Sequence, residues 1–184
     1  QTEVGESANS YSIDWGTTDS KNYAISEELG TLTVTTNATA AVKLIAADAE
    51  KVYDGTPLTK ADGVTWEGLP AGFTVEASST GSQTNAGESA NVVNDGYVIY
   101  DANNVDQTAN FTNVTKEPGT LTVTKAPVTI KTGSAEKEYD GTALTKDEAS
   151  ISGLVNGETA TVTATGSQTE VGESANSYSI DWGT

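Results

Sequence analysis

Cysteine, histidine, methionine and arginine are all absent from the sequence. Without cysteine the chain can form neither disulfides nor thiolate metal sites, and without histidine it lacks the most common general base and zinc ligand. No apolar run is long enough to span a membrane. We therefore expect no catalytic residues, no metal or cofactor, and no membrane insertion in this segment.

Positive charge is also scarce, because the 9 basic residues are all lysines and face 26 acidic residues, giving a net charge of −17. Such a surface repels phosphate backbones and anionic lipid, so we expect no nucleic-acid partner. An acidic, cysteine-free chain rich in threonine and serine suits an exported protein, and an acidic face that serves only solubility would have the same composition.

The sequence repeats itself. The stretch QTEVGESANSYSIDWGT occupies residues 1–17 and returns unchanged at residues 168–184, with an imperfect copy, QTNAGESAN, at residues 83–91. KVYDGTPLTK at residues 51–60 recurs as KEYDGTALTK, and GTLTVT at residues 30–35 recurs at residues 119–124. The three markers keep one cyclic order, which indicates a tandem unit of about 85 residues.

Only residues 41–125 contain all three markers of one unit. Residues 1–36 then form the C-terminal part of a preceding repeat, and residues 126–184 form the N-terminal part of a following one. A unit this small buries only about 60–65% of its unfolded surface and gains stability from neighbour contacts. We expect the adjacent repeats of the same chain, or neighbouring identical chains, to complete the two ends.

The hydrophobic pattern has the period of β-strands. Val42, Leu44 and Ala46 alternate with less apolar neighbours, as do Leu121 and Val123 at the end of the unit. No stretch has a sustained helical period. The sequence therefore predicts an all-β fold of tandem antiparallel Ig-like β-sandwiches in an elongated rod. A β-grasp unit is the alternative, although it requires a helix that no stretch predicts.

The ordered set K.YDGT.LT, then GLVNGETA at residues 153–160, then NY or NF before GTLTVT resembles the YDG and MBG repeat domains of bacterial surface proteins. The NY and NF pairs are residues 22–23 and 110–111. The resemblance covers nearly the whole chain. It implies an extracellular location on the bacterial cell surface and a role in attachment or reach, and it supplies no active site.

The YDG tripeptides are Tyr53-Asp54-Gly55 and Tyr139-Asp140-Gly141. A tyrosine can stack on a sugar and an aspartate can accept its hydroxyl hydrogen bonds. The structural interpretation is that the tyrosine fills the core while Asp-Gly makes a turn. We favour the structural interpretation, because the same letters in each unit serve the same fold.

A second hypothesis is an intramolecular amide between a lysine on an early strand and an asparagine on the last strand. The reaction needs a buried lysine as nucleophile and a carboxyl group that relays the proton. The candidate residues are Lys51, Lys43, Asn110, Asn113, Glu50 and Asp54. The alternative is that Lys51 and Glu50 are a solvated surface pair.

Two further motifs have candidate binding roles. Trp15 and Trp182 follow aspartate in DWGT and are candidates for stacking on a glycan, whereas Trp66 aligns with Ile151 and is expected to pack in the core. Residues 101–106, DANNVD, have the oxygen ligands of a calcium site but lack the glycine of an EF-hand loop. Turn formation is the simpler explanation for these residues.

The leading functional hypothesis is a structural stalk or spacer that projects a binding tip from the cell. One alternative is a multivalent adhesive module, in which each unit binds a host glycan or glycoprotein weakly and repetition supplies avidity. Another is homotypic association into fibres through exposed strand edges.

Overall fold

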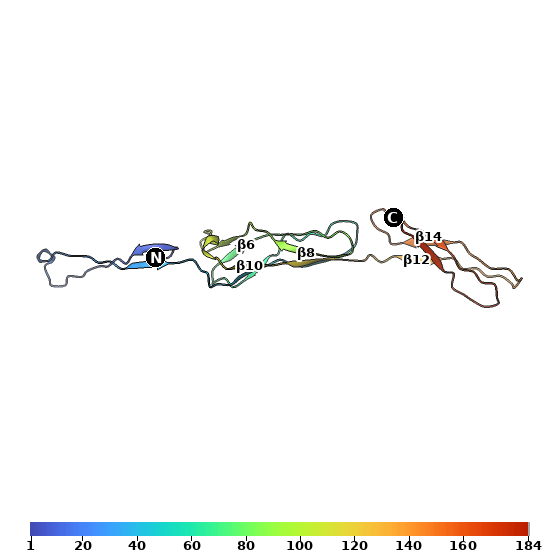
Figure 1. Ribbon diagram of the computed structural model, residues 1–184, viewed down its shortest axis with the longest axis horizontal. Coiled ribbons are helices and arrows are strands. Elements are labelled where there is room, and N and C mark those ends of the chain that lie inside the picture. Colours follow the sequence, from blue (N-terminus) through green and yellow to red (C-terminus); the bar gives the residue numbers. More distant parts are fainter. Residues whose placement is uncertain (184) are drawn as a thin grey trace. The chain divides into compact units, whose positions relative to one another are not determined.

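The computed structural model describes residues 1–183, in which the regular structure consists of short β-strands and two 3-10 turns (Figure 1). The expected all-β class is confirmed. The described residues contain no α-helix, so the β-grasp alternative lacks its helix, and none of them belongs to a helix that could cross a membrane. The strands form six small sheets of two to four strands each. The Ig-like sandwich stays a prediction.

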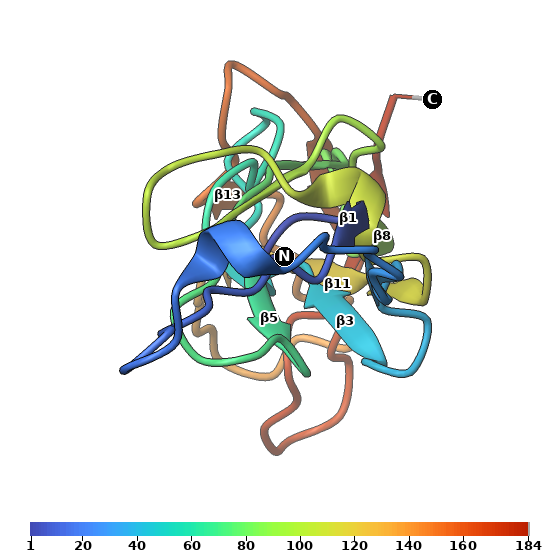
Figure 2. The ribbon, with the colours of Figure 1, turned by 90° about the vertical axis from the view of Figure 1, so that its left-hand side faces the viewer.

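The chain divides into two compact units by its internal contacts, and the first comprises Gln1–Ala47, Asp62–Ser79 and Val92–Pro118. Its elements are β1 (Gly5–Ala8), η1 (Ser20–Asn22), β2 (Thr31–Val34), β3 (Val42–Ile45), β5 (Thr65–Glu67), β6 (Thr74–Glu76), β9 (Val98–Tyr100), η2 (Thr108–Asn110) and β10 (Val114–Glu117). β1 pairs with β2, β6 pairs with β9, and β3 lies between β5 and β10. Figure 2 shows β3 beside β5.

The core of the first unit gathers around β3. Val42 and Leu44 are completely buried, as the alternating pattern predicted, and Ala46 is 4% exposed. Ile99 and Phe111 belong to the same cluster. The ring of Phe111 meets that of Phe73 edge to face, with centroids 5.1 Å apart. Trp66 lies opposite Leu44 in the β5–β3 pair but is 38% exposed, so its predicted burial in the core is wrong.

The second unit comprises Asp48–Ala61, Thr80–Asn91 and Gly119–Thr184. Its strands, two of which extend slightly beyond these limits, are β4 (Ala49–Val52), β7 (Ser79–Thr80), β8 (Gly87–Val93), β11 (Gly119–Thr124), β12 (Thr129–Thr132), β13 (Ala149–Ser152), β14 (Thr161–Ala164) and β15 (Tyr178–Asp181). One sheet has the order β4-β11-β8-β7, while β12 pairs with β13 and β14 with β15. Leu121 and Val123 of β11 are buried, as predicted.

Two pairings are parallel, which differs from the wholly antiparallel arrangement that the sequence predicts. β10 runs parallel to β3, and β11 runs parallel to β4. Parallel partners need a long connection. Here β3 and β4 lie near the start of residues 41–125, and β10 and β11 lie near the end. The prediction missed these pairings because strand alternation specifies which face is buried but not which strand lies alongside.

The strand pair β1–β2 has the same register as β8–β11. Gly5 lies opposite Val34 and Ala8 opposite Thr31, just as Gly87 lies opposite Val123 and Ala90 opposite Thr120. The compact units are defined by contacts and the expected repeats by sequence, so the limits 1–36, 41–125 and 126–184 stay predictions.

The identical segments at residues 1–17 and 168–184 form different strands. In the first copy β1 forms against β2, while residues 11–14 are irregular. In the second copy residues 172–175 are irregular, while β15 forms against β14. Each copy therefore forms the strand for which a partner strand lies beside it.

Candidate functional site

Lys51, Asp54 and Thr56 make a closed set of polar contacts around the first YDG tripeptide, and we call this set the YDG clamp. Asp54 Oδ1 lies 2.6 Å from Lys51 Nζ and accepts hydrogen bonds from the amide and hydroxyl of Thr56 at 2.9 and 2.8 Å. The Lys51 ammonium also donates to the Thr56 carbonyl oxygen at 2.5 Å. Gly55 makes the turn with a φ of 78°, a conformation that glycine adopts without strain.

The charged groups of the clamp are bonded to each other. The hydrogen bond from Lys51, followed by those from Thr56, holds the pKa of the Asp54 carboxyl well below its usual range. Asp54 is solvent-exposed, so water screens its attraction to Lys51 and the pair contributes modestly to stability. An ionised carboxylate bonded to its own turn is a poor general base. The contacts are those of a locked turn, which is the structural interpretation of YDG.

A second YDG clamp has the same contacts to its aspartate at the second tripeptide. Asp140 Oδ1 lies 2.7 Å from Lys137 Nζ and accepts from the Thr142 amide and hydroxyl at 2.9 and 2.8 Å. Gly141 has a φ of 77°. Lys137 and then Thr142 lower the pKa of the Asp140 carboxyl. The local sequence K.YDGT is therefore sufficient to specify this turn in both places.

The two YDG tyrosines differ in their surroundings. Tyr53 is half-buried, and its amide donates to the Thr124 carbonyl oxygen of β11 at 2.8 Å. Tyr139 is 63% exposed. Neither belongs to the buried core, so the expectation that these rings fill it is wrong. The difference in exposure coincides with the presence of β11 beside Tyr53, since the described residues place no such strand beside Tyr139.

The candidate cross-link residues have other partners. The Lys51 ammonium belongs to the YDG clamp, and the Asn110 side chain donates to Gln107 Oε1 at 2.5 Å. Glu50 is exposed, and Lys43 Nζ lies 3.0 Å from Glu117 Oε2. Lys51 and Asn110 belong to different compact units. The intramolecular amide stays a hypothesis, which an intact mass lowered by one ammonia would support.

The two candidate tryptophans have different environments despite their identical local sequence. Trp15 stacks on Tyr23, with ring centroids 6.0 Å apart and planes inclined by 29°. Trp182 is 53% exposed. In both copies the aspartate side chain accepts a hydrogen bond from the glycine amide two residues later. The distance is 2.9 Å from Gly16 to Asp14 and 3.0 Å from Gly183 to Asp181. Glycan stacking by these rings stays a prediction.

The DANNVD segment uses its aspartates in turns. Asp101 Oδ1 accepts the amides of Asn103 and Val105 at 2.8 and 2.9 Å, and Asp106 Oδ1 accepts the Thr108 amide at 2.9 Å. These hydrogen bonds lower the pKa of the Asp101 carboxyl, and the Thr108 hydroxyl, followed by the Thr108 amide, lowers the pKa of the Asp106 carboxyl. Within residues 1–183 no group of three or more metal-binding side chains comes together.

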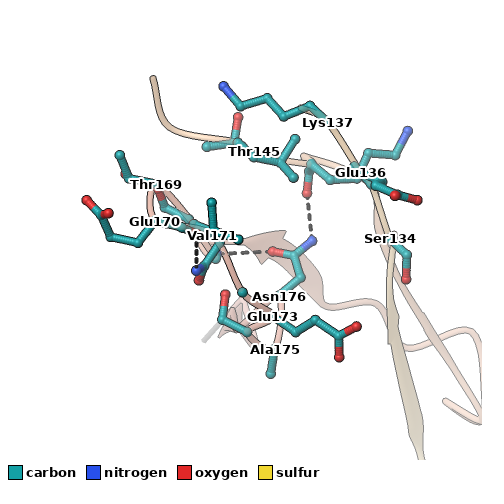
Figure 3. Close-up of a pocket in the computed structure, with 18 of the residues that line it drawn as sticks. Ser134, Glu136, Lys137, Thr145, Thr169, Glu170, Val171, Glu173, Ala175 and Asn176 are labelled. Carbon is teal, nitrogen blue, oxygen red and sulfur yellow. Dashed lines mark hydrogen bonds between the residues drawn. The ribbon is translucent and has the colours of Figure 1, made fainter. Parts of the chain in front are cut away.

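The second unit has a concavity that sequence reasoning missed. It has a volume of about 550 Å³ and is lined by residues 133–139, 144–146 and 166–176, which we call the open groove. Figure 3 shows Ser134 and Glu136 along one side, with Thr169, Glu170 and Val171 along the other. Lys137 of the second YDG clamp also lines it.

Polar contacts hold the floor of the open groove. The Asn176 side chain donates to the carbonyl oxygens of Gly133 and Lys146 at 3.0 and 2.8 Å and accepts the Gly166 amide at 3.1 Å. Asn91, at the same place in GESAN, donates to the Lys60 carbonyl oxygen at 2.8 Å. The repeat alignment contained the signal for this groove, because it matches residues 135–138 and 172–176 to the two strands that flank β11.

Comparisons of the chain with protein-family models, with curated proteins and with solved structures found no match.

Proposed function

We propose that this chain is part of a spacer on a bacterial cell surface, built from tandem β units of about 85 residues that carry a binding tip away from the cell. The resemblance to YDG and MBG repeats motivates the location. In this role function depends on the number of units and on their stiffness. An active site is not required.

The observation that carries the proposal is the recurrence of the same contacts at matched places in the sequence. In both YDG clamps the aspartate accepts from the lysine ammonium and from the threonine amide and hydroxyl, with lysine–aspartate distances of 2.6 and 2.7 Å. Leu58 pairs with Gln83 as Leu144 pairs with Gln168. Contacts repeated so closely are expected of a scaffold, in which each unit has the same task.

The surface charge fits the same role. Acidic residues outnumber lysines by 26 to 9, so neighbouring spacers would repel one another and stay separate along a cell surface. The segment between the expected second and third units, Thr124-Lys125-Ala126-Pro127, is short and contains proline, which limits swing between units.

Small-angle X-ray scattering tests the proposal with proteins that contain one, two and four copies of residues 41–125. A spacer predicts a maximum dimension that grows in proportion to the number of copies. A dimension that saturates as copies are added would show that the units fold back on one another and would contradict a spacer.

Multivalent adhesion is the second candidate, because Trp182 offers an exposed aromatic face. Trp182→Ala would then reduce glycan binding by an isolated chain, while Trp15→Ala, which removes a ring already stacked on Tyr23, would reduce it less. Binding that is equal in both variants would exclude these rings as the adhesive site.

A further inference from the structure

β11 shows how a GTLTVT strand is held in this fold. It lies between β4, to which it is parallel, and β8, to which it is antiparallel. Leu121 lies opposite Ala49 on one side and Ser89 on the other, and its side chain is completely buried. A methyl group built on Gly81 would lie 3.1 Å from Leu121 Cδ1, so this glycine leaves the space that the leucine occupies.

The open groove is bounded by the counterparts of the segments that hold β11. Residues 135–138 follow the sequence of β4, and residues 172–176 repeat the GESAN of β8. Gly166 corresponds to Gly81 and lines the groove. Among the described residues no strand lies between these two segments. The groove therefore has the walls of a β11 site but no strand in it.

The matching strand lies elsewhere in the same chain with its apolar side uncovered. β2 and its neighbours, residues 30–35, have the sequence GTLTVT, identical to β11. Leu32 is 41% exposed, whereas Leu121 is 0% exposed. β2 belongs to a two-stranded sheet, in which β1 pairs with one of its edges. Its other edge is the one that β11 presents to β4.

We propose that residues 30–35 of one copy of this chain occupy the open groove of a second copy. There the strand runs parallel to residues 135–138 and antiparallel to residues 172–175, in the registers that β11 has with β4 and β8. The occupant is a second copy because the chain itself contains the six-residue sequence that these walls accommodate. The inference does not depend on the spacer role.

Strand exchange of this kind keeps the antiparallel pairing. When residues 30–35 leave β1, they lose the partner sequence GESA, and in the groove they regain GESA at residues 172–175. The parallel pairing with residues 135–138 and the burial of Leu32 are then net gains. Exchange of an identical element between copies is a low-cost route to association.

Apolar side chains in the two parts of the chain that would associate also complement each other. Val128 is 39% exposed, whereas its counterpart Val42, the first residue of β3, is 0% exposed. Tyr23, which matches Phe111, is 61% exposed against 7%. Val42 and Phe111 belong to one core cluster. Residues 126–184 thus present the valine half of such a core, and residues 1–36 present the aromatic half.

The association joins different surfaces of the two copies, so it leaves one strand and one groove free at the ends of every assembly that does not close into a ring. Such head-to-tail contacts produce open-ended chains or closed rings instead of a simple twofold dimer. Sedimentation velocity on the 184-residue chain is expected to show a series of species that grows with concentration.

Two leucine variants test the strand. Leu32→Ser removes the side chain that the groove buries and is expected to weaken association by about tenfold or more. Leu29→Ser is the matched control, because Leu29 is 45% exposed and its counterpart, Pro118, is exposed beside β11. Equal weakening by both variants, or by neither, would overturn the proposal. A size that does not change with concentration in the unaltered chain would also overturn it.

Disulfide trapping tests the register. The chain has no native cysteine, so only the introduced cysteines can form a disulfide. Thr122 lies opposite Glu50 in the β11–β4 pair, so Thr33 is expected opposite Glu136 of the second copy. Chains carrying Thr33→Cys and Glu136→Cys should form covalent multimers on mild oxidation. Thr33→Cys with Ser134→Cys, displaced by two residues on the same face, should form far fewer. Similar yields in both would overturn the register.

A synthetic peptide of residues 23–36 gives a readout that needs no variant. It should compete for the groove and reduce the size of the assemblies, while the same peptide with Leu32→Ser should not. If the peptide binds but the unaltered chain stays monomeric, the groove accepts the strand without joining copies. That result contradicts a second copy as the occupant.

Discussion

Leu121 is completely buried between two strands, whereas Leu32, at the same place in the same GTLTVT sequence, is 41% exposed. The difference arises from the strands beside them. Leu121 lies between β4 and β8, whereas β1 is the only strand beside Leu32 among residues 1–183. Identical residues therefore contribute differently to stability, according to the neighbours that the fold supplies.

We expect Leu121→Ala to lower the free energy of unfolding by about 3 kcal/mol, because it removes a buried side chain and leaves a cavity. Leu32→Ala is the matched control and should cost less than about 1 kcal/mol, since its side chain is already in contact with water. Urea unfolding at a concentration where the chain is monomeric measures both. Equal losses would contradict the burial difference between the two leucines.

The YDG clamps should make stability depend on pH in the acid range. Asp54 and Asp140 have pKa values below those in the unfolded chain, so their stabilisation is fully present above the unfolded pKa of about 3.9 and is lost as pH falls through the folded pKa. Unfolding free energy measured from neutral pH downward should fall less steeply in Asp54→Asn/Asp140→Asn than in the unaltered chain.

A control for this pH experiment is Asp14→Asn, which alters a turn aspartate bonded to the Gly16 amide without a lysine. The double clamp variant should change the slope more than this control does. An unchanged acid slope in the double variant would show that the lysine–aspartate contacts do not persist in solution.

Gly141→Ala should destabilise the second clamp by about 1–2 kcal/mol, because Gly141 has a φ of 77° and an alanine there clashes with its own backbone. No neighbouring atom lies within 4 Å of the added methyl, so the effect is purely conformational. Gly96→Ala, which also has open space but no positive φ, should be neutral within about 0.5 kcal/mol. Denaturant melts of both variants provide the comparison.

Association through the open groove should strengthen as salt is added. Acidic residues outnumber lysines in residues 1–36 and in residues 126–184, so the two partners repel each other at low ionic strength. Raising the ionic strength to about 0.15 M shortens the screening length to about 8 Å and reduces this repulsion. Sedimentation at several salt concentrations measures the effect, and weaker association at high salt would indicate a contact made by ion pairs.

The sequence was informative where a strand has one buried face. Period-2 alternation correctly placed Val42 and Leu44, and likewise Leu121 and Val123, in the interior. The turn at Asp54-Gly55 was likewise predicted from adjacent residues. These features depend on residues within a few positions of one another, so a single sequence suffices to recognise them.

The sequence was uninformative where a partner strand decides the structure. Residues 1–17 and 168–184 are identical, yet one copy forms β1 and the other forms β15. The parallel pairs β10–β3 and β11–β4 join distant segments, and alternation does not specify them. The burial of the YDG tyrosine was predicted wrongly for the same reason, because the exposure of Tyr53 depends on β11, the strand that lies beside it.

The parallel pairs also determine how this part of the chain responds to a pulling force. β3 and β4 come near the start of residues 41–125, and β10 and β11 come at the end, each pair running in one direction. Tension on the two ends of this segment would therefore slide the paired strands along each other. The backbone hydrogen bonds of each pair share the load in shear, whereas a hairpin pulled apart from its open end loses them one after another. A fold held in this way resists extension without any covalent cross-link.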